Sequence, residues 1–256
     1  MRNLNAIKKR ISAIKSTQKI TNAMRLVSIS KVQQFKRLQD SLAPYFNEVE
    51  KISKDYKTTS EANDKPILYV VYAPDLSLVS AYTGGLFRFI KEKEVGDFYW
   101  VGTQGYDTAI KNGLNIINDK EHSDDVDLDE LAEICASYLE KYNISLIIPE
   151  YGRGGEMSLT FDITPLNVVL DDNYDVIYYP NFQEVKARYR DIVLKAMIYY
   201  AYYASKFSEY TTRRIAMEAA TNNADEMIED LQLVYNRVRQ EAITQEISEL
   251  VSGMEA

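Results

Sequence analysis

Glycine-rich turns are where a nucleotide-binding activity would first show in this sequence. Gly84 and Gly85 lie in the segment APDLSLVSAYTGGLF, without the Lys-Ser or Lys-Thr pair that completes a P-loop. The dinucleotide fingerprint GxGxxG is also missing. The segments 102–105 (GTQG) and 151–155 (YGRGG) each follow an apolar run. We interpret the first as a strand-to-helix turn and the second as a hairpin turn, in preference to phosphate or anion cradles.

The single histidine, His122, lies in the acidic stretch DKEHSDDVD and has no cysteine or histidine at metal-ligand spacing. The acids at 124, 125, 127 and 129 lack the glycine and the closing glutamate of an EF-hand loop. This stretch is typical of a solvated loop leading into a helix N-terminus. Four tyrosines between 199 and 203 circle a predicted helix and indicate packing at a junction. We therefore expect no catalytic residue, no metal site and no cofactor, and hence no active site in this chain.

Charge is distributed unevenly along the 256 residues, which carry 30 basic and 38 acidic side chains and a net charge of −8. Ten basic residues fall between Arg2 and Arg37, with no acid before Asp40. Phe35 is the single aromatic residue in this run, too few for the interleaving that single-strand binding uses, so the run favours a solvated or partner-facing helix over a nucleic-acid site. The lone cysteine, Cys135, excludes an intrachain disulfide and fits a reducing compartment. No apolar run approaches the roughly 18 residues of a membrane span, so any membrane association is expected to come through partners.

Two terminal segments predict long helices. Residues 2–57 contain no glycine and a single proline, Pro44, and residues 182–252 contain neither. Spacings of three and four residues predict one apolar stripe on each. The N-terminal stripe is Ile7, Ile11, Ile14, Ile20, Met24, Val27, Phe35, Leu38 and Leu42; the C-terminal stripe is Ala220, Ala224, Met227, Leu231, Val234, Val238, Ile243, Ile247 and Val251. A helix that long, roughly 80 Å at about 1.5 Å per residue, needs a partner of similar length to be stable.

The middle segment predicts alternating strands and helices. Strands are expected at 66–73, 97–102 and 144–149, each a continuous apolar run of a doubly buried strand. Helices are expected at 80–94, 104–112 and 125–142, an order that implies a mostly parallel sheet. The alternating segment 156–164 predicts an edge or antiparallel strand, and 175–179 one more short strand.

Together these patterns predict an α/β fold class: a long antiparallel coiled coil of the N- and C-terminal helices, with a Rossmann-like α/β domain inserted between them. The expected domains are the N-terminal coiled-coil helix at 1–57, the α/β globular domain at 58–181 and the C-terminal coiled-coil helix at 182–256. An α/β domain without a visible active site, held on two long helices, indicates a mechanical or scaffolding part. A coiled-coil adaptor and an α/β enzyme with an unrecognised site are the competing interpretations.

The two ends of the chain resemble the gamma subunit of F-type ATPases. In Ser208–Met254 the resemblance is ungapped and detailed, and the N-terminal helix adds a second, shorter match. The matching C-terminal positions are Ser208, Glu209, Arg214, Ala216, Met217, Ala220, Thr221, Asn223, Ala224, Tyr235–Arg237, Arg239, Gln240, Ile243–Glu246 and Val251–Gly253; the N-terminal ones are Ile7, Arg10, Ile11, Thr17–Thr21, Ala23, Met24, Val27 and Lys31.

This resemblance implies a central rotary shaft, threaded through a ring of three alpha and three beta subunits, that couples ATP hydrolysis or synthesis in the ring to rotation. It implies beta-subunit contacts at Arg239 and Gln240, neighbouring contacts at Thr244 and Glu246, and a contact near the beta-subunit hinge at Met24. The base of the shaft is expected to meet the epsilon subunit and the membrane rotor ring. The expected location is the cytoplasmic face of the cell membrane, with the chain held peripherally through its partners.

Two departures from the family pattern lie in or beside the α/β domain. Where the family has a glycine-rich turn after the first strand, this chain has Pro74–Ser80 and no glycine. Tyr179 stands where the family has an acid before the last helix. An alternative hypothesis follows, in which the chain is the shaft of a specialised F-like ATPase whose output is not an ordinary proton-driven rotor, for example one driving a cell-surface or motility machine.

Overall fold

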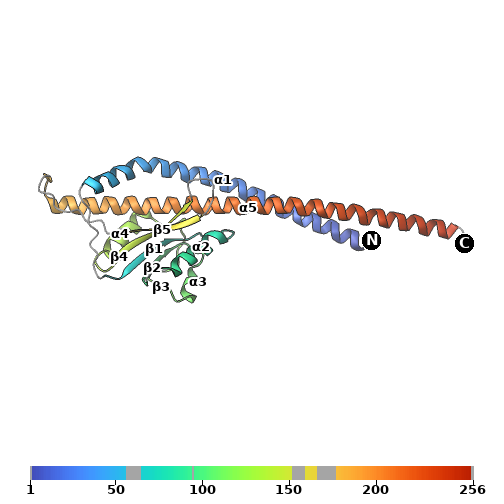
Figure 1. Ribbon diagram of the computed structural model, residues 1–256, viewed down its shortest axis with the longest axis horizontal. Coiled ribbons are helices and arrows are strands. Elements are labelled where there is room, and N and C mark those ends of the chain that lie inside the picture. Colours follow the sequence, from blue (N-terminus) through green and yellow to red (C-terminus); the bar gives the residue numbers. More distant parts are fainter. Residues whose placement is uncertain (1, 56–64, 94, 152–158, 166–176, 255–256) are drawn as a thin grey trace. The chain divides into compact units, whose positions relative to one another are not determined.

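The computed structural model describes residues 2–55, 65–93, 95–151, 159–165 and 177–254. By contacts the chain divides into two compact units: Met1–Ile29 with Arg213–Ala256, here called the two-helix unit, and Ser30–Thr212, called the α/β unit. The domain boundaries expected at 57/58 and 181/182 remain a prediction. The elements are α1 (Arg2–Asp55), β1 (Ile67–Tyr72), α2 (Ser80–Lys91), β2 (Asp97–Val101), α3 (Tyr106–Lys111), β3 (Asn115–Ile116), α4 (Leu128–Tyr138), β4 (Asn143–Tyr151), β5 (Leu159–Pro165) and α5 (Phe182–Met254) (Figure 1).

The sheet of the α/β unit has the strand order β3-β2-β1-β4-β5. Strands β3, β2, β1 and β4 are parallel, and β5 joins β4 antiparallel, which confirms the expectation for this segment. The expected strands at 66–73, 97–102 and 144–149 are β1, β2 and β4. Strand β3 was not predicted, because two residues are too few to carry a hydrophobic pattern.

Alternate side chains of the central strands enter two separate cores. Leu68, Val70 and Tyr72 of β1 pack with α4 and with the part of α5 around Ile198. The intervening residues, such as Val71, pack with α2 and α3 on the other face. Figure 1 shows α4 and α5 on one side of the sheet and α2 and α3 on the other. A strand buried on both faces needs apolar residues at every position, which explains the continuous run in the sequence.

Helices α1 and α5 also pair inside the α/β unit, through aromatic rings. Phe35 of α1 stacks on Tyr210 of α5, with ring centroids 5.6 Å apart, and lies 6.3 Å from the Tyr203 ring. Tyr203 contacts Tyr199 and Tyr202 in turn. The tyrosine run therefore packs at a junction of elements, as expected.

The turn at 102–105 joins β2 to α3, as predicted, and Asp127 caps α4 by accepting hydrogen bonds from the amides of Asp129 and Glu130. The hairpin turn expected at 151–155 lies outside the described residues beyond Tyr151. The strand expected at 175–179 lies partly outside them, and residues 177–179 are not in a strand. Within the described ranges, none of the helices combines the length and hydropathy that a membrane crossing needs.

We predict that Gly102→Ala destabilises the α/β unit by at least about 2 kcal/mol, because of backbone strain and overpacking. Gly102 has φ +108°, and an added Cβ would lie 2.0 Å from the Ala73 carbonyl oxygen. The matched control is Gly84→Ala in α2, where nothing lies within 4 Å. There alanine should be neutral or stabilising by up to about 1 kcal/mol. Urea unfolding followed by circular dichroism measures both, and equal stability of the two variants would contradict the prediction.

Candidate functional site

The carboxyl edge of the parallel strands is where doubly wound folds take their ligands, and in this chain a carboxylate fills it. Asp75, just after β1, accepts hydrogen bonds from the Thr103 amide at 3.0 Å, the Ser123 hydroxyl at 2.7 Å and the Asp124 amide at 3.2 Å. His122 lies beside it, with Nδ1 3.6 Å from Asp75 Oδ1. The amides that would cradle a phosphate therefore already have an internal acceptor.

Burial by itself would raise the pKa of Asp75, but the hydrogen bonds from Ser123 and Thr103 and the nearby Lys206 charge outweigh it, and the net pKa is lowered. The carboxylate side chain is only 9% exposed. Among the described residues no group of three His, Cys, Asp or Glu side chains could hold a metal ion. Asp75 thus connects, by hydrogen bonds, the loops that follow β1, β2 and β3.

From the lowered pKa of Asp75 we predict how the free energy of unfolding changes at low pH. A carboxylate whose pKa is lower folded than unfolded stabilises the fold above its ordinary pKa of 3.8, and this contribution is lost as the pH falls through the folded pKa. We expect the wild-type chain to lose stability more steeply than Asp75→Asn below about pH 4, and to be the more stable of the two at pH 7. Urea unfolding across a pH series tests this, and parallel curves would contradict it.

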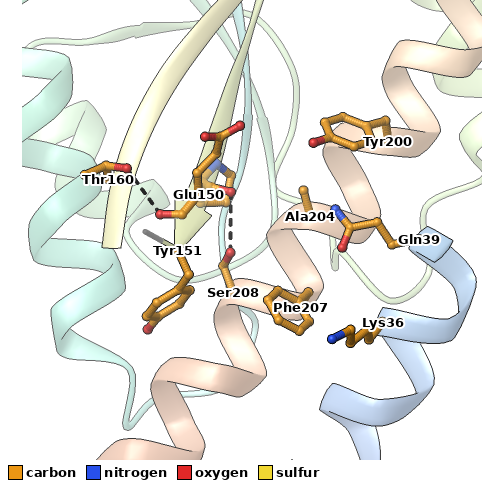
Figure 2. Close-up of a pocket in the computed structure, with 10 residues that line it drawn as sticks. Lys36, Gln39, Glu150, Tyr151, Thr160, Tyr200, Ala204, Phe207 and Ser208 are labelled. Atoms are coloured by element: carbon orange, nitrogen blue, oxygen red, sulfur yellow. Dashed lines mark hydrogen bonds between the residues drawn. The ribbon is translucent and has the colours of Figure 1, made fainter. Parts of the chain in front are cut away.

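A cleft of about 630 Å³ lies between α1, α5 and the end of β4 (Figure 2). Lys36 and Glu150 contribute its charges, and Phe207 contributes an apolar wall. The Ser208 hydroxyl donates to the Pro149 carbonyl oxygen at 3.4 Å. The described residues that line it include no histidine or cysteine, so among them the hydroxyls have no imidazole base or thiol partner.

In the two-helix unit the helices meet along a partly polar seam. The Thr221 hydroxyl donates to the Thr21 hydroxyl at 2.8 Å, and Gln18 donates its side-chain amide to Asp225. Moving three residues back along α1 corresponds to moving four residues forward along α5, so the two helices run antiparallel. The contact confirms the predicted antiparallel pairing of the terminal helices.

The predicted stripes are only partly correct. Ile20 is 60% exposed and Val27 59% exposed, whereas the polar residues Thr21 and Ser28 are buried. Most buried and half-buried positions in the first 28 residues of α1 follow a heptad spacing (Leu4, Ile7, Ile11, Ile14, Gln18, Thr21, Arg25 and Ser28), and the stripe residue Met24 is half-buried beside them. Such a 3-4 spacing keeps one seam facing the partner helix, and it includes polar residues that a search for apolar residues passes over.

The same correction applies to α5. Its seam follows Met217, Thr221, Ala224, Ile228, Leu231, Tyr235, Val238 and Ala242. The stripe residues Met227, Val234, Ile243, Ile247 and Val251 are instead 44–56% exposed. Together with Ile20, Leu26, Val27, Leu233 and Leu250 they leave a second, uncovered set of apolar side chains on the two-helix unit.

The residues predicted as partner contacts lie on the surface of this unit. Arg239, Gln240, Thr244 and Glu246 are exposed on α5, and Met24 is half-buried on α1. Gln240 and Thr244 are four residues apart and share one helix face. Because Thr21 contacts Thr221, Met24 lies beside the α5 turn near 218, roughly six helical turns from Arg239. The structure therefore places Gln240 and Thr244 on one face of α5, and Met24 about six helical turns from Arg239.

Comparison with known proteins identifies the family. A family model described as ATP synthase matches residues 3–256. The ATP synthase gamma chain of Halothermothrix orenii is 32% identical over 286 aligned positions, covering 100% of this chain and 99% of that relative. That of Caldanaerobacter subterraneus is 31% identical, covering 95% of this chain and 96% of the relative. The chain belongs to the ATP synthase gamma-chain family.

Solved structures share the fold of this family. A chain of the Euglena gracilis mitochondrial ATP synthase (OSCP/F1/c-ring) gives a TM-score of 0.71 at 15% identity, over 99% of this chain and 94% of that one. A chain of the Tetrahymena thermophila mitochondrial ATP synthase central stalk and c-ring gives 0.61 at 19% identity, over 78% of this chain and 99% of that one. At these identities the likeness concerns the fold alone.

The sequence analysis did not predict the buried polar contacts among Asp75, Ser123 and Lys206 at the sheet edge. Asp75 and Ser123 are 48 residues apart in the chain, and Ser123 and Lys206 are 83 apart. No local motif marks such pairs. The available signal is Lys206, a lysine that follows an uncharged stretch of α5 at residues 196–205.

We predict that Ala224→Leu destabilises the two-helix unit by about 1–3 kcal/mol, the usual cost of overpacking. Ala224 is 6% exposed in the seam, where a larger side chain would force the helices apart. Met227→Leu on the exposed face should change stability by less than about 0.5 kcal/mol. Thermal unfolding of the two variants measures the difference, and a neutral Ala224→Leu would show that position 224 is not in the seam.

Proposed function

We propose that this chain is the central rotary stalk of an F-type ATP synthase or ATPase, coupling ATP hydrolysis or synthesis in a ring of three alpha and three beta subunits to rotation of the stalk. The observation that carries the proposal is the antiparallel contact of Thr21 with Thr221. Both residues belong to the sequence segments that match the family. A stalk of this kind holds no active site and acts through its surface.

The surface of the two-helix unit suits such a role because its two helices differ in charge. The α1 part carries basic residues and no acid, whereas the α5 part exposes Asp225, Glu226, Glu229 and Asp230. Three surrounding beta subunits would therefore meet three different faces. The angle of the stalk then biases each catalytic site through differences in contact energy, and the coupling is reciprocal: nucleotide state turns the stalk, and a turned stalk changes nucleotide affinity.

The uncovered apolar side chains of the two-helix unit support a surrounding partner. Ile247, Leu250 and Val251 near the end of α5 are 53–69% exposed. Contiguous exposed apolar surface on a folded protein usually marks an interaction site. Cover from alpha and beta subunits would remove this surface from water while leaving the seam between the helices unchanged.

We assign the beta-subunit contacts to Arg239 and Gln240, with Thr244 and Glu246 beside them and Met24 contacting near the beta-subunit hinge. The exposure of the four α5 residues is what such contacts need. Arg239 provides a fixed fork of donors for a partner carboxylate or carbonyl group. The epsilon subunit and the membrane rotor ring are further proposed partners, and the chain would lie peripherally at the cytoplasmic face of the cell membrane, held through these subunits.

One observation favours a specialised F-like ATPase as the second candidate. The glycine-free loop after β1 holds Leu78 at φ +70°, a conformation that suits glycine, and leaves Leu76 57% and Leu78 49% exposed. Strain of this kind at a non-glycine residue needs support from its surroundings. A pull-down from the native source decides between the candidates, because recovery of a complete rotor ring and epsilon subunit would exclude the specialised form.

We predict that Arg239→Ala with Gln240→Ala lowers ATP turnover of the assembled complex about ten-fold or more, as loss of one or two polar contacts at an interface does. The chain itself should stay folded, since both residues are exposed and outside the seam. Steady-state ATP hydrolysis by the complex reconstituted with alpha and beta subunits measures the effect.

The matched control is Glu249→Ala, an exposed α5 residue that accepts a hydrogen bond from Gln245 at 2.9 Å. It should leave turnover within about two-fold of the wild type. Unchanged turnover in the Arg239/Gln240 variant would remove the contact assignment but not the family membership. Failure of the wild-type chain to assemble with alpha and beta subunits would remove the stalk proposal itself.

A further inference from the structure

Lys206 is a lysine of α5 buried inside the α/β unit, with a side chain 4% exposed. Its ammonium group donates to the Ser123 hydroxyl at 2.7 Å and contacts the Asp124 carboxylate. Glu209, one turn further along α5, lies 3.6 Å away and is equally buried. A lysine is buried in this way only when it is paired, because an isolated ammonium group is costly to remove from water.

Through Ser123 and Asp75 the lysine connects α5 to the loops that follow β1, β2 and β3. Ser123 accepts from Lys206 and donates to Asp75, which uses both capacities of one hydroxyl. Asp75 in turn accepts from the amide of Thr103. A displacement of Lys206 would therefore disturb the loops that follow β1, β2 and β3 together.

Little space is left at this edge. The cavity beside Lys206, lined by Tyr72, Tyr82, Tyr202 and Glu209 among others, has a volume of about 10 Å³. That is close to the minimum for a single water molecule. The edge where a doubly wound fold takes its ligand is thus occupied by Asp75 together with Lys206 of α5.

The other contacts of α5 with the sheet differ in kind. Leu194, Ile198 and Ala201 pack against the sheet in an apolar core, and apolar burial is non-directional. Apolar burial therefore opposes separation of α5 from the sheet, but it only weakly fixes the position of α5 along and around its own axis. Tyr72 adds a neutral hydrogen bond to the Ile198 carbonyl oxygen at 3.3 Å. Lys206 adds a charge-assisted link, which is directional and roughly twice as strong as a neutral one.

We propose that Lys206 is the positioning residue that locks the axial and rotational setting of α5 in the α/β domain, through Ser123 and Asp124, so that torque in the helix is transmitted to the domain. The proposal rests on the stalk function proposed above. In this role α5 carries the torque, and its Lys206 side chain binds the loops at the carboxyl edge of the sheet. Removing the contacts of Lys206 with Ser123 and Asp124 lowers the torsional stiffness between α5 and the rest of the α/β unit. The surface that faces the ring stays unchanged.

The test measures the stiffness of that joint in the assembled complex. The alpha/beta ring is fixed to a surface, and a bead is attached to the α/β domain at Val95→Cys, where the native side chain is fully exposed. The native Cys135 does not compete for the label, because it is 1% exposed and burial raises the pKa of its thiol to about 12. The angular fluctuation of the bead while the motor waits for ATP reports the stiffness.

The main variant is Ser123→Ala with Asp124→Ala, which cuts the link from the loop side and keeps the Lys206–Glu209 pair within α5. The angular variance should widen by at least about two-fold, in line with the relative strength of a charge-assisted link. ATP turnover without a bead should stay at the wild-type level, while turnover against a viscous load should fall. Lys206→Met should behave the same way, and its failure to fold would leave the loop variant as the deciding measurement.

The matched control is Lys195→Met, which removes an exposed α5 link to Asp129 of 2.9 Å and should leave the variance unchanged, since exposed pairs contribute little. Unchanged variance in the Ser123/Asp124 variant would overturn the role of Lys206 and leave the stalk function intact. A lowered melting temperature with wild-type stiffness would likewise overturn it, since that is the result of a purely structural contact. A wild-type complex whose bead never rotates would overturn the stalk function and this inference with it.

Discussion

Neither long helix of this chain can stay helical in water by itself, and the structure depends on the face that the two bury together. Helix formation is cooperative, and most helical stability in proteins comes from tertiary packing of one face. Helices α1 and α5 supply that packing for each other twice, through Thr21 and Thr221 in the two-helix unit and through Phe35 and Tyr210 in the α/β unit. The sheet is inserted in the chain between two helices that already need each other.

The seam of the two-helix unit exchanges some stability for a defined register. Gln18, Thr21 and Thr221 bury less apolar surface than leucines would. A slip along the seam would break the hydrogen bond between Thr21 and Thr221, and each hydroxyl would keep only its bond to a carbonyl oxygen of its own helix. Polar residues at seam positions therefore specify one alignment. In a stalk, that alignment decides which residues of α5 point outward toward the ring.

In the α/β unit, side chains of the chain itself occupy the sheet edge at which doubly wound folds commonly bind ligands. Its parallel strands end at an edge where Asp75 accepts the hydrogen bonds that a bound anion would accept elsewhere. Lys206 of α5 enters the same edge and pairs with Ser123. Fold and function are separable because function depends on the groups at the site. Here those groups satisfy one another and tie the domain to the helix that crosses it.

The sequence by itself determined the family and most of the secondary structure, with β3 missed and residues 177–179 wrongly predicted as a strand. Long striped segments without glycine and with at most one proline predicted helices, short continuous apolar runs predicted buried strands, and the detailed C-terminal match extended over many positions of one helix. It also showed that no P-loop or metal motif is present. These features are local, and local periodicity is what a single sequence reveals.

Tertiary structure decided which of two offset apolar sets on each helix is buried. Ile14 and Ile20 look equivalent in the sequence, yet Ile14 lies in the seam and Ile20 is 60% exposed, because burial depends on the surface of the opposite helix. It also decided the contacts among Asp75, Ser123 and Lys206, which come from distant parts of the chain. The topology of the sheet brings the loops of Asp75 and Ser123 to one edge, where α5 places Lys206. No pattern within a single segment of the sequence predicts these contacts.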